Sequence, residues 1–313
     1  MRKRLLKFIV CPKCKKDLKL KVEVKQKQEV KTGSLICSGC PKKYPIVRFI
    51  PRFVKTDKYA DNFAFEWQIH KTTQLDSYNK NQISRQTFNE KTRLGKRDLK
   101  GKLVLDVGCG MGRFMEVVKN YGAEVIGIDL SRAVDVARAN LKRFKKCHFI
   151  QADVFNLPFK ANTFETIFSI GVLHHTPDTK KAFMCLPSLL KKNGKLAIWV
   201  YGENTFRPYD HFGRFWRRLT PILPKRVLYI LCHFAVPLYW TYKIPFLGTL
   251  INLLIPYSTD SNWRWRILDT YDWYSPKYQW KHTYPEVAEW YKEANLKIKK
   301  IGKKEASLLG VKK

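Results

Sequence analysis

Four cysteines near the start of the chain form two CxxC pairs, Cys11 with Cys14 and Cys37 with Cys40. The two pairs are separated by the 22 residues between Cys14 and Cys37. Each CxxC turn directs two sulfur atoms at one point, so four thiolates at this spacing can close a tetrahedral zinc site. Disulfide bonds are the alternative, which the reducing conditions of a cytosol disfavour. Four cysteine ligands leave no open coordination position, so the zinc predicted here is structural.

A second group of residues suited to chemistry follows a short apolar run, Leu103 to Leu105. From Lys102 the chain reads KLVLDVGCGMGRF, which places Asp106 and a glycine-rich turn directly after that run. A buried strand, a glycine turn and a helix let the backbone approach a small ligand at the end of a parallel sheet. Glycine is needed because a Cβ would block the approach and positive φ angles are expected there. The turn differs from the G-x-G-x-x-G of a dinucleotide site, because its third glycine comes one position early.

Three later stretches read as further strands of the same sheet. They are EVIGIDLS ending near Asp129, FIQADVFNLPF with Asp153, and TIFSIGVLHHT at residues 166–176. A helix at 180–192, a turn at Asn193-Gly194 and a fifth strand at 195–201 are expected to follow. Together with the glycine turn, these stretches resemble the class I S-adenosylmethionine (SAM) dependent methyltransferases of the methyltransferase type 11-like group, over roughly half the chain.

The resemblance implies roles for residues at the ends of these strands. Asp129 would bind the two ribose hydroxyls of SAM, and Asp153 would contact the adenine amino group. Val154 or Phe155 would flank the adenine ring. The full set of cofactor-binding residues implied by the resemblance is Asp106, Gly108, Cys109, Gly110, Gly112, Asp129, Leu130, Asp153, Val154 and Gly171.

The cysteine module resembles the Trm112-like zinc ribbons that are fused to methyltransferases or that partner them. A hairpin is expected at 18–31, between the CxxC pairs, and an apolar patch at 43–54. The module either recognises a substrate or partner, or stabilises a region that is too small to fold alone. The other cysteines, Cys109, Cys147, Cys185 and Cys232, are interpreted as small buried apolar residues.

Candidate acids and bases are His174, His175, Asp272 and His282. The two adjacent histidines follow the fourth strand, where a methyl acceptor would arrive, and imidazole can remove a proton at neutral pH. Asp272 and His282 are expected in loops that face the substrate. Each side chain has a structural alternative, such as anchoring a loop or capping a helix that starts at Thr283.

The segment before the glycine turn is expected to be a helical cap over SAM. It contains the run FAFEWQIHKTTQLDSYN and a helix pattern around Ile83 to Thr92. Trp67, Gln74 and Arg85 are candidates to touch ligand. Phe63 and Phe65 are as readily explained by packing of the cap onto the sheet.

The composition indicates an anionic partner. The chain has 313 residues and 60 Lys and Arg against 26 Asp and Glu, which gives a formal net charge of +34. Such an excess favours nucleic acid, phospholipid or a phosphorylated substrate. Basic residues are dispersed from Arg2 to Lys313, so a lysine-rich surface without a specific partner is the alternative.

An apolar stretch from Val227 to Ile255 is broken by Pro237 and Pro245 and preceded by basic residues at 214–226. It either lies in a membrane interface, covers an apolar substrate as a lid, or packs on the domain as a helical insertion. The sequence shows no signal peptide and no uninterrupted apolar run long enough to span a membrane. We therefore interpret the protein as cytoplasmic, with a peripheral position at the inner membrane face as a further hypothesis.

The expected fold is α/β, with a seven-stranded Rossmann-like sheet of six parallel strands and one antiparallel strand. Five segments are expected: a zinc ribbon at 1–54, a helical linker and cap at 55–100, the SAM-binding core at 101–201, an apolar and basic helical insertion at 202–269, and the C-terminal part of the sheet at 270–313.

The functional hypothesis is SAM-dependent methyl transfer to an unidentified O, N or C atom. The acceptor is expected to be amphiphilic or anionic, of the small-molecule, glycan or lipid-linked class. Two alternatives stay open: an RNA methyltransferase, and a zinc-ribbon interaction module whose SAM-binding domain is not catalytic.

Overall fold

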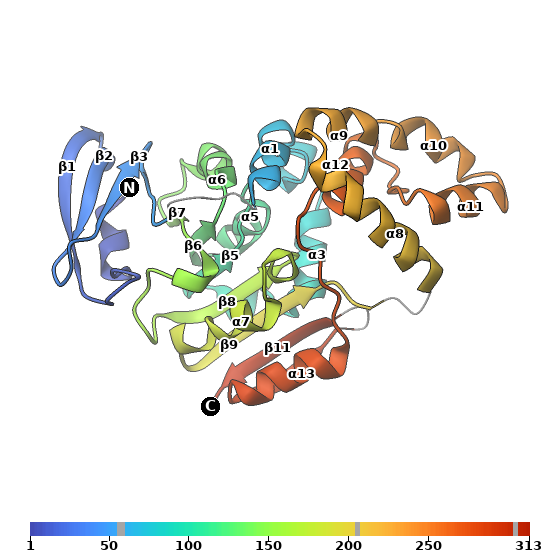
Figure 1. Cartoon of the computed structure of the whole chain (residues 1–313). Helices are drawn as coiled ribbons and strands as arrows, with labels where there is room; N and C mark the ends of the chain where they lie inside the picture. The colour runs from blue at the N-terminus through green and yellow to red at the C-terminus, as the bar shows by residue number, and fades with distance from the viewer. Residues whose placement is uncertain (55–59, 204–206, 303–305) are drawn as a thin grey trace.

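The structure contains two β-sheets (Figure 1). It is a computed structural model, and it describes residues 1–54, 60–203, 207–302 and 306–313. The beginning of the expected linker (55–59), part of the expected insertion (204–206) and residues 303–305 lie outside the described residues. A small N-terminal sheet has the order β1-β2-β3-β4, and a central sheet has the order β10-β11-β9-β8-β5-β6-β7. The strands are β1 (Leu18–Gln26), β2 (Glu29–Cys37), β3 (Lys43–Val47), β4 (Ile50–Pro51), β5 (Leu103–Val107), β6 (Glu124–Asp129), β7 (Cys147–Gln151), β8 (Phe164–Ile170), β9 (Leu190–Val200), β10 (Leu296–Ile301) and β11 (Ala306–Lys312).

The central sheet has the predicted composition of strands. Pairs β5–β6, β6–β7, β5–β8 and β8–β9 are parallel, while β11 is antiparallel to both of its neighbours, β9 and β10. Six strands therefore share one direction and β11 is reversed, which confirms the predicted fold class. The chain order reverses at β5, which lies between β6 and β8. Open α/β sheets bind their ligands at such a switch point, outside the carboxyl ends of the strands.

Helices cover both faces of the central sheet. Alternate residues of a strand point to opposite faces, so Val104 packs in one apolar core while Leu105 and Val107 pack in the other. The first core also receives α3 (Ile83–Thr92), α5 (Arg113–Asn120) and α6 (Ala133–Leu141). The second core receives α7 (Thr179–Met184), α13 (Tyr284–Glu293) and the N-terminal domain. The result is a three-layer arrangement with one core on each side of the sheet.

Local predictions were confirmed where the signal was strong and wrong where a proline intervened. Helix α3 has the predicted bounds, and Thr283 caps α13 by accepting a hydrogen bond from the backbone N–H of Glu286. The predicted helix at 180–192 is wrong, because α7 ends at Met184. Pro187 then begins a separate 3-10 turn, and β9 already starts at Leu190. Proline cannot donate the N–H that a continuing helix requires.

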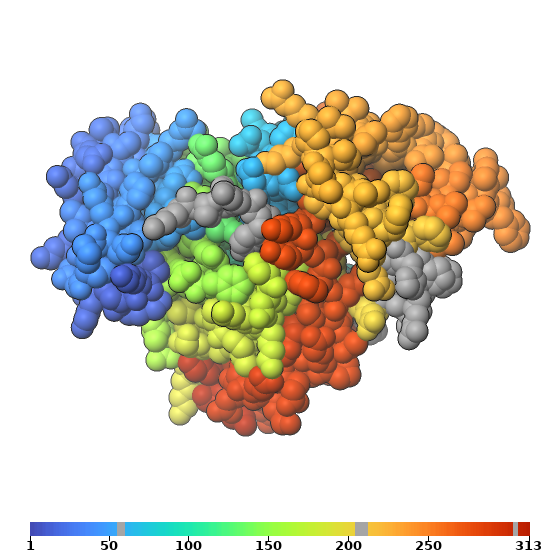
Figure 2. Space-filling model, viewed as in Figure 1, coloured from blue at the N-terminus to red at the C-terminus, as the bar shows by residue number. Residues whose placement is uncertain are grey.

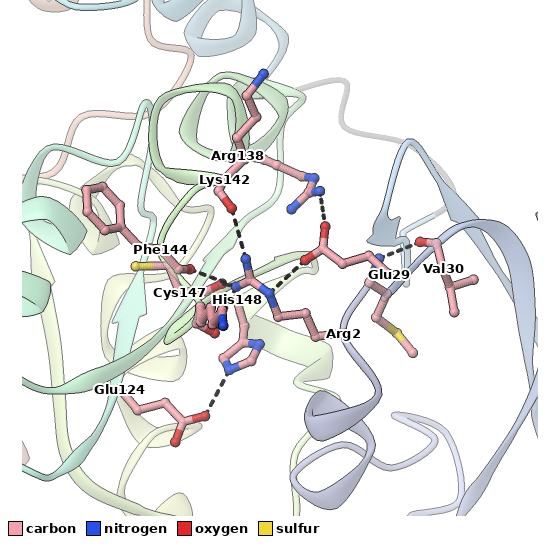
Figure 3. A network of polar contacts seen from close by, with 11 residues as sticks. Arg2, Glu29, Val30, Glu124, Arg138, Lys142, Phe144, Cys147 and His148 are labelled. Carbon is pink, nitrogen blue, oxygen red and sulfur yellow. Dashed lines mark hydrogen bonds and ion pairs between the residues drawn. The ribbon is translucent and has the colours of Figure 1, made fainter. Parts of the chain in front are cut away.

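The N-terminal domain is held against the edge of the central sheet by ionic contacts (Figure 3). Arg2 donates hydrogen bonds to the backbone carbonyls of Lys142, Phe144 and Cys147, at distances of 2.6–2.9 Å. Glu29, on β2, lies 2.7 Å from Arg2 and also pairs with Arg138 of α6 at 2.5 Å. The apolar residues Leu35 and Ile46 of the N-terminal sheet belong to the same core as the central strands. The domain is therefore part of the folded body.

The expected insertion forms a group of short helices, some of which project from the body (Figures 1 and 2). They are α8 (Arg207–Leu219), α9 (Lys225–Cys232), α10 (Ala235–Thr241), α11 (Leu247–Leu254) and α12 (Trp263–Tyr274). Helix α12 runs through the expected boundary at 269/270, so the insertion extends to Tyr274. The apolar stretch 227–255 is divided among α9, α10 and α11, and no helix in the described ranges is long and apolar enough to cross a membrane. The remaining short helices are α1 (Asp61–Ile69), α2 (Asp76–Asn79) and α4 (Lys96–Leu99).

Candidate active site

A cavity of about 430 Å³ lies at the carboxyl ends of β5, β6 and β8. The glycine turn after β5 forms one wall, and Gly108 and Gly110 there have φ angles of +81° and +50°. A Cβ on Gly108 would lie 2.4 Å from the side chain of Val172, and one on Gly110 would lie 3.1 Å from the indole nitrogen of Trp67. Only glycine leaves this turn open beneath the Trp67 ring.

The turn is tied to the end of the neighbouring strand by Asp129. Its Oδ2 accepts a hydrogen bond from the backbone N–H of Gly110 at 2.9 Å. Its Oδ1 accepts bonds from the backbone N–H and the hydroxyl of Ser131, at 2.8 and 2.7 Å. The carboxylate is thereby held at the cavity wall, at the place where a ligand that follows the glycine turn would meet it.

Seven of the ten residues expected to bind cofactor line this cavity, namely Gly108, Cys109, Gly110, Asp129, Leu130, Val154 and Gly171. Gly112 instead packs under the turn, where a Cβ would lie 3.0 Å from Leu141. Asp153 accepts a hydrogen bond from the backbone N–H of Phe155 at 3.0 Å and so caps a 3-10 turn. Asp106 is buried beneath the turn, where burial and the neighbouring Asp129 raise the pKa of its carboxyl.

The helical cap contributes Trp67 and Gln74 to the cavity, as expected. Arg85 is exposed and bonds to the side chain of Gln82 instead, so it does not reach the cavity. Phe63 also lines the cavity, whereas Phe65 packs against Tyr229 and Tyr271 with ring centroids 5.9 Å apart in each case.

The four candidate acids and bases separate into two pairs. His175 and Asp272 line the cavity, whereas His174 and His282 do not. The His174 ring is fully buried and stacks on Tyr201 with centroids 3.9 Å apart. His282 lies behind the cavity wall, where its Nδ1 is 2.9 Å from Glu286. The expectation that Asp272 lies in a loop is wrong: it lies in α12, which Asn262 caps and which contains neither proline nor glycine.

The geometry defines the tautomer of His175. Its Nδ1 lies 2.8 Å from the backbone carbonyl of Tyr278, and because a carbonyl only accepts, Nδ1 carries the proton. The lone pair is then on Nε2, for which the described part of the chain offers no hydrogen-bond partner. Burial lowers the pKa of this imidazole, while Asp272 and the bond to Tyr278 oppose that effect. A neutral histidine with an open Nε2 can accept a proton.

Two carboxyl groups that sequence reasoning missed line the same cavity as this histidine. Glu66 of α1 and Asp269 of α12 join Asp272 in the cavity wall, and Tyr201 donates a 3.0 Å hydrogen bond to Asp272. Burial and the two aspartates raise the pKa of Glu66 well above its ordinary value. Burial and Asp272 raise the pKa of Asp269 to about 7. Glu66 had a detectable signal, since it is a single acid within the aromatic run FAFEW.

Arg113 was also missed. It lies at the start of α5, lines the cavity and donates a 2.9 Å hydrogen bond to the hydroxyl of Ser84. Burial lowers the pKa of its guanidinium to about 10, although Asp269 and Asp76 oppose that effect. The cavity thus contains a cationic group as well as the carboxyl-rich end.

The four cysteines of the two CxxC pairs form a separate cluster. Their sulfur atoms all lie within 4.8 Å of one another, and Cys14 is 3.3 Å from Cys37 and 3.6 Å from Cys40. Sulfur ligands about 2.3 Å from a tetrahedral zinc would be roughly 3.8 Å apart, so the cluster fits that ion. None of the four forms a disulfide. Of the other cysteines, Cys109, Cys147 and Cys232 are buried as expected, and Cys185 is partly exposed.

Family models match two separate parts of the chain. Residues 105–198 match the family described as methyltransferase domain, and residues 2–48 match the family described as Trm112p-like protein. Phosphoethanolamine N-methyltransferase 2 of Caenorhabditis elegans is 31% identical over 156 residues, which cover 48% of this chain and 34% of that protein. A ubiquinone biosynthesis O-methyltransferase of Coxiella burnetii is 34% identical over 113 residues, which cover 36% of this chain and 48% of that protein.

The chain thus spans about half or less of the curated relatives it matches. Among solved structures, a complex between the Haloferax volcanii Trm112 methyltransferase activator and a methyltransferase has 13% identity and a TM-score of 0.46, over 80% of this chain and 96% of that one. The chain contains a methyltransferase domain, preceded by an N-terminal Trm112p-like domain.

Proposed function

We propose that the chain transfers the methyl group of SAM to a nitrogen or oxygen atom of an acceptor bound at the carboxyl-rich end of the cavity. The observation that carries the proposal is the joining of two kinds of wall in one cavity. One wall is the open glycine turn with Asp129. The other contains His175, Asp272 and Glu66.

The first wall fits SAM. A Cβ at Gly108 or Gly110 would fill the cradle, and Asp129 presents carboxylate oxygens that can accept the ribose hydroxyls. The Trp67 ring over the turn would exclude water from the ligand. Bound SAM supplies a sulfonium-activated methyl group, so the protein mainly has to orient the acceptor and keep the site dry.

The second wall fits an acceptor whose reacting group is neutral or cationic, such as an amine or a hydroxyl. Any of its carboxyls that is ionised would repel a phosphate or carboxylate at that end of the cavity. The open Nε2 of His175 can take the proton that an attacking hydroxyl or ammonium group must lose. Asp272 would stabilise the resulting imidazolium, since it already raises the pKa of His175. A small-molecule, glycan or lipid-linked acceptor satisfies this requirement if its anionic part lies outside the cavity.

The test combines SAM binding with turnover. Asp129→Ala should weaken SAM binding at least about tenfold, or ~1.4 kcal/mol, by calorimetry. His175→Asn keeps a donor for the Tyr278 carbonyl but lacks Nε2, so it should lower kcat by about 10²–10⁴ and leave SAM binding unchanged. His233→Asn is the matched control. The Nδ1 of His233 also lies 2.9 Å from a backbone carbonyl, that of Tyr229, but this histidine is exposed.

The acceptor class follows from labelled SAM incubated with cell extract and fractionated into lipid, glycan, RNA and small molecules. RNA is the second candidate, favoured by the net charge of +34. Label in the RNA fraction would identify RNA as the acceptor. Separately, tight SAM binding by Asp129→Ala would refute the assignment of the ribose contact. Absence of label from every fraction would instead favour a binding module without catalysis.

We also propose that the cysteine cluster holds one structural zinc. Elemental analysis of the purified protein should find one zinc per chain. Four freely reacting thiols and no zinc would contradict it.

A further inference from the structure

The projecting helices have an unusual surface. We call residues 212–255, which contain most of α8 and all of α9, α10 and α11, the arm. Of the 27 large apolar side chains that are exposed among the described residues, 17 lie in the arm. Phe246 is 90% exposed and Ile222 is 80% exposed. Scattered apolar side chains on a surface need no explanation, but a concentration of this size marks an interaction site.

The arm is attached to the body mainly through α12, which contacts both α9 and α10, and Arg266 of α12 donates a hydrogen bond to the backbone carbonyl of Val236 in α10. Leu228 and Cys232 of α9 pack with Ile267 and Tyr271 of α12 in a small buried cluster. The more distant helices α10 and α11 project away from the central sheet (Figures 1 and 2). An open groove between α8 and α11 is lined almost entirely by apolar atoms, from side chains that include Phe215 and Leu254. Internal packing therefore does not account for the apolar surface.

Phe246 forms an exposed tip between α10 and α11. Its backbone has a φ angle of +64°, which is unfavourable for a bulky side chain, and the ring nevertheless points to solvent. Strain of this kind persists in folded proteins mainly at binding or switch sites. The tip thus has the properties of an inserted side chain.

The charge of the arm favours an anionic partner. Residues 212–255 contain no Asp or Glu, but they contain Arg214, Arg217, Arg218, Lys225, Arg226 and Lys243, of which Lys225 forms an ion pair with Asp61. Basic residues beside large aliphatic side chains, with Trp240 and Tyr242 among them, have the composition of a helix that lies in the interface of an anionic bilayer. A nucleic acid would match the charge but not the exposed aliphatic side chains.

We propose that the arm docks on the surface of an anionic phospholipid bilayer, with Phe246 and Ile222 inserted and the basic side chains at the headgroups. This proposal goes beyond the methyl transfer proposed above and does not depend on it. The short helices of the arm can lie in the interface without spanning it. Binding then has two components: a salt-sensitive one from charge and a salt-insensitive one from apolar insertion.

The experiment is sedimentation of the full chain with vesicles of phosphatidylcholine alone and of phosphatidylcholine with phosphatidylglycerol, at low and high salt. The protein should sediment with the anionic vesicles at low salt and be partly released at high salt. Each basic residue near the surface adds about fivefold to the partition coefficient. Arg218→Glu with Arg226→Glu should reduce the salt-sensitive part, because both side chains are exposed.

Ile222→Ser with Phe246→Ser should reduce binding at both salt concentrations. The matched control is Val24→Ser with Ile301→Ser, which removes exposed apolar side chains outside the arm and should bind as the parent does. Thermal melting verifies that each variant is folded. Failure of the parent to sediment with either vesicle would overturn the proposal, as would full binding by the Ile222/Phe246 variant. Self-association that this variant abolishes, without vesicle binding by the parent, would identify a second copy of the chain as the partner instead.

Discussion

The Trm112p-like domain and the arm are both additions to the central sheet, but the charged groups next to their junctions with the body are arranged in opposite ways. At the first junction Glu29 lies between two arginines, Arg2 and Arg138, so that unlike charges compensate one another (Figure 3). Next to the second junction, in the cavity wall formed by α1 and α12, burial and the nearby Asp269 and Asp272 raise the pKa of Glu66. The first arrangement stabilises a junction, whereas the second costs stability and is typical of a functional site.

The apolar surfaces of the two additions differ in the same way. Leu35 and Ile46 of the N-terminal domain are fully buried in the core that contains the central strands. The arm leaves Phe246 and Ile222 in solvent. The N-terminal domain is therefore part of the body's core, while the arm leaves a large apolar surface exposed.

The largest effect is expected from loss of the zinc proposed for the cysteine cluster. Stripping the metal with a strong chelator, or the substitution Cys11→Ser, should unfold the N-terminal domain, because structural zinc contributes about 10–16 kcal/mol of binding free energy. Since this domain shares a core with the central sheet, the melting temperature of the whole chain should fall. Cys185→Ser, outside the cluster, should have little effect. Melting followed by circular dichroism is the measurement, and an unchanged melting curve would show that the two parts are independent.

The next largest effect is a pH dependence of the free energy of unfolding, which arises from Asp269 of α12. The folded pKa of Asp269 is about 7, against an ordinary value of 3.8. The folded state therefore holds this proton more tightly. The associated stability is complete below the ordinary pKa and is lost as pH rises to about 7, by at most ~4 kcal/mol.

The measurement is urea unfolding at about pH 5 and about pH 8, with Asp269→Asn as the variant. Between the two pH values, the free energy of unfolding should decrease less in the variant than in the parent. An equal decrease in both proteins would indicate that Asp269 is not the group responsible.

A loss of about 3 kcal/mol in the free energy of unfolding is expected for Glu29→Gln, because Arg2 and Arg138 would be left partly buried without their partner. The matched control is Glu289→Gln, which breaks an exposed pair with Lys292 and should cost less than about 1 kcal/mol. Equal losses in the two variants, measured by urea unfolding, would remove the distinction between the two junctions.

The smallest effect is expected in the arm. Phe246→Ser should change the free energy of unfolding by no more than about 0.5 kcal/mol, because its ring is exposed. Leu35→Ala, in the shared core, should cost about 2–5 kcal/mol. Urea unfolding measures both variants. A larger loss of stability for Phe246→Ser than for Leu35→Ala would show that the Phe246 ring is packed in solution.

Much of the fold could be predicted because its signals are local. The apolar runs that become β5 and β6, the glycine turn at Gly108–Gly112, the two CxxC pairs and the cap at Thr283 each depend on a few neighbouring residues. Errors arose where one local signal competed with another. Pro187 ended a helix that was expected to continue, and α12 extended across Asp272, where a loop was expected.

The sequence by itself therefore determined the central sheet, the turn that can accept SAM and the sulfur atoms that can hold zinc. Only the tertiary structure decided which ionisable groups share the cavity. His174 and His175 are neighbours in the chain, yet one stacks beneath Tyr201 and the other lines the cavity. Glu66 reaches the same wall as Asp272 because α1 and α12, far apart in sequence, pack together. Burial and long-range packing set the chemistry of these side chains, and neither property is contained in a short stretch of residues.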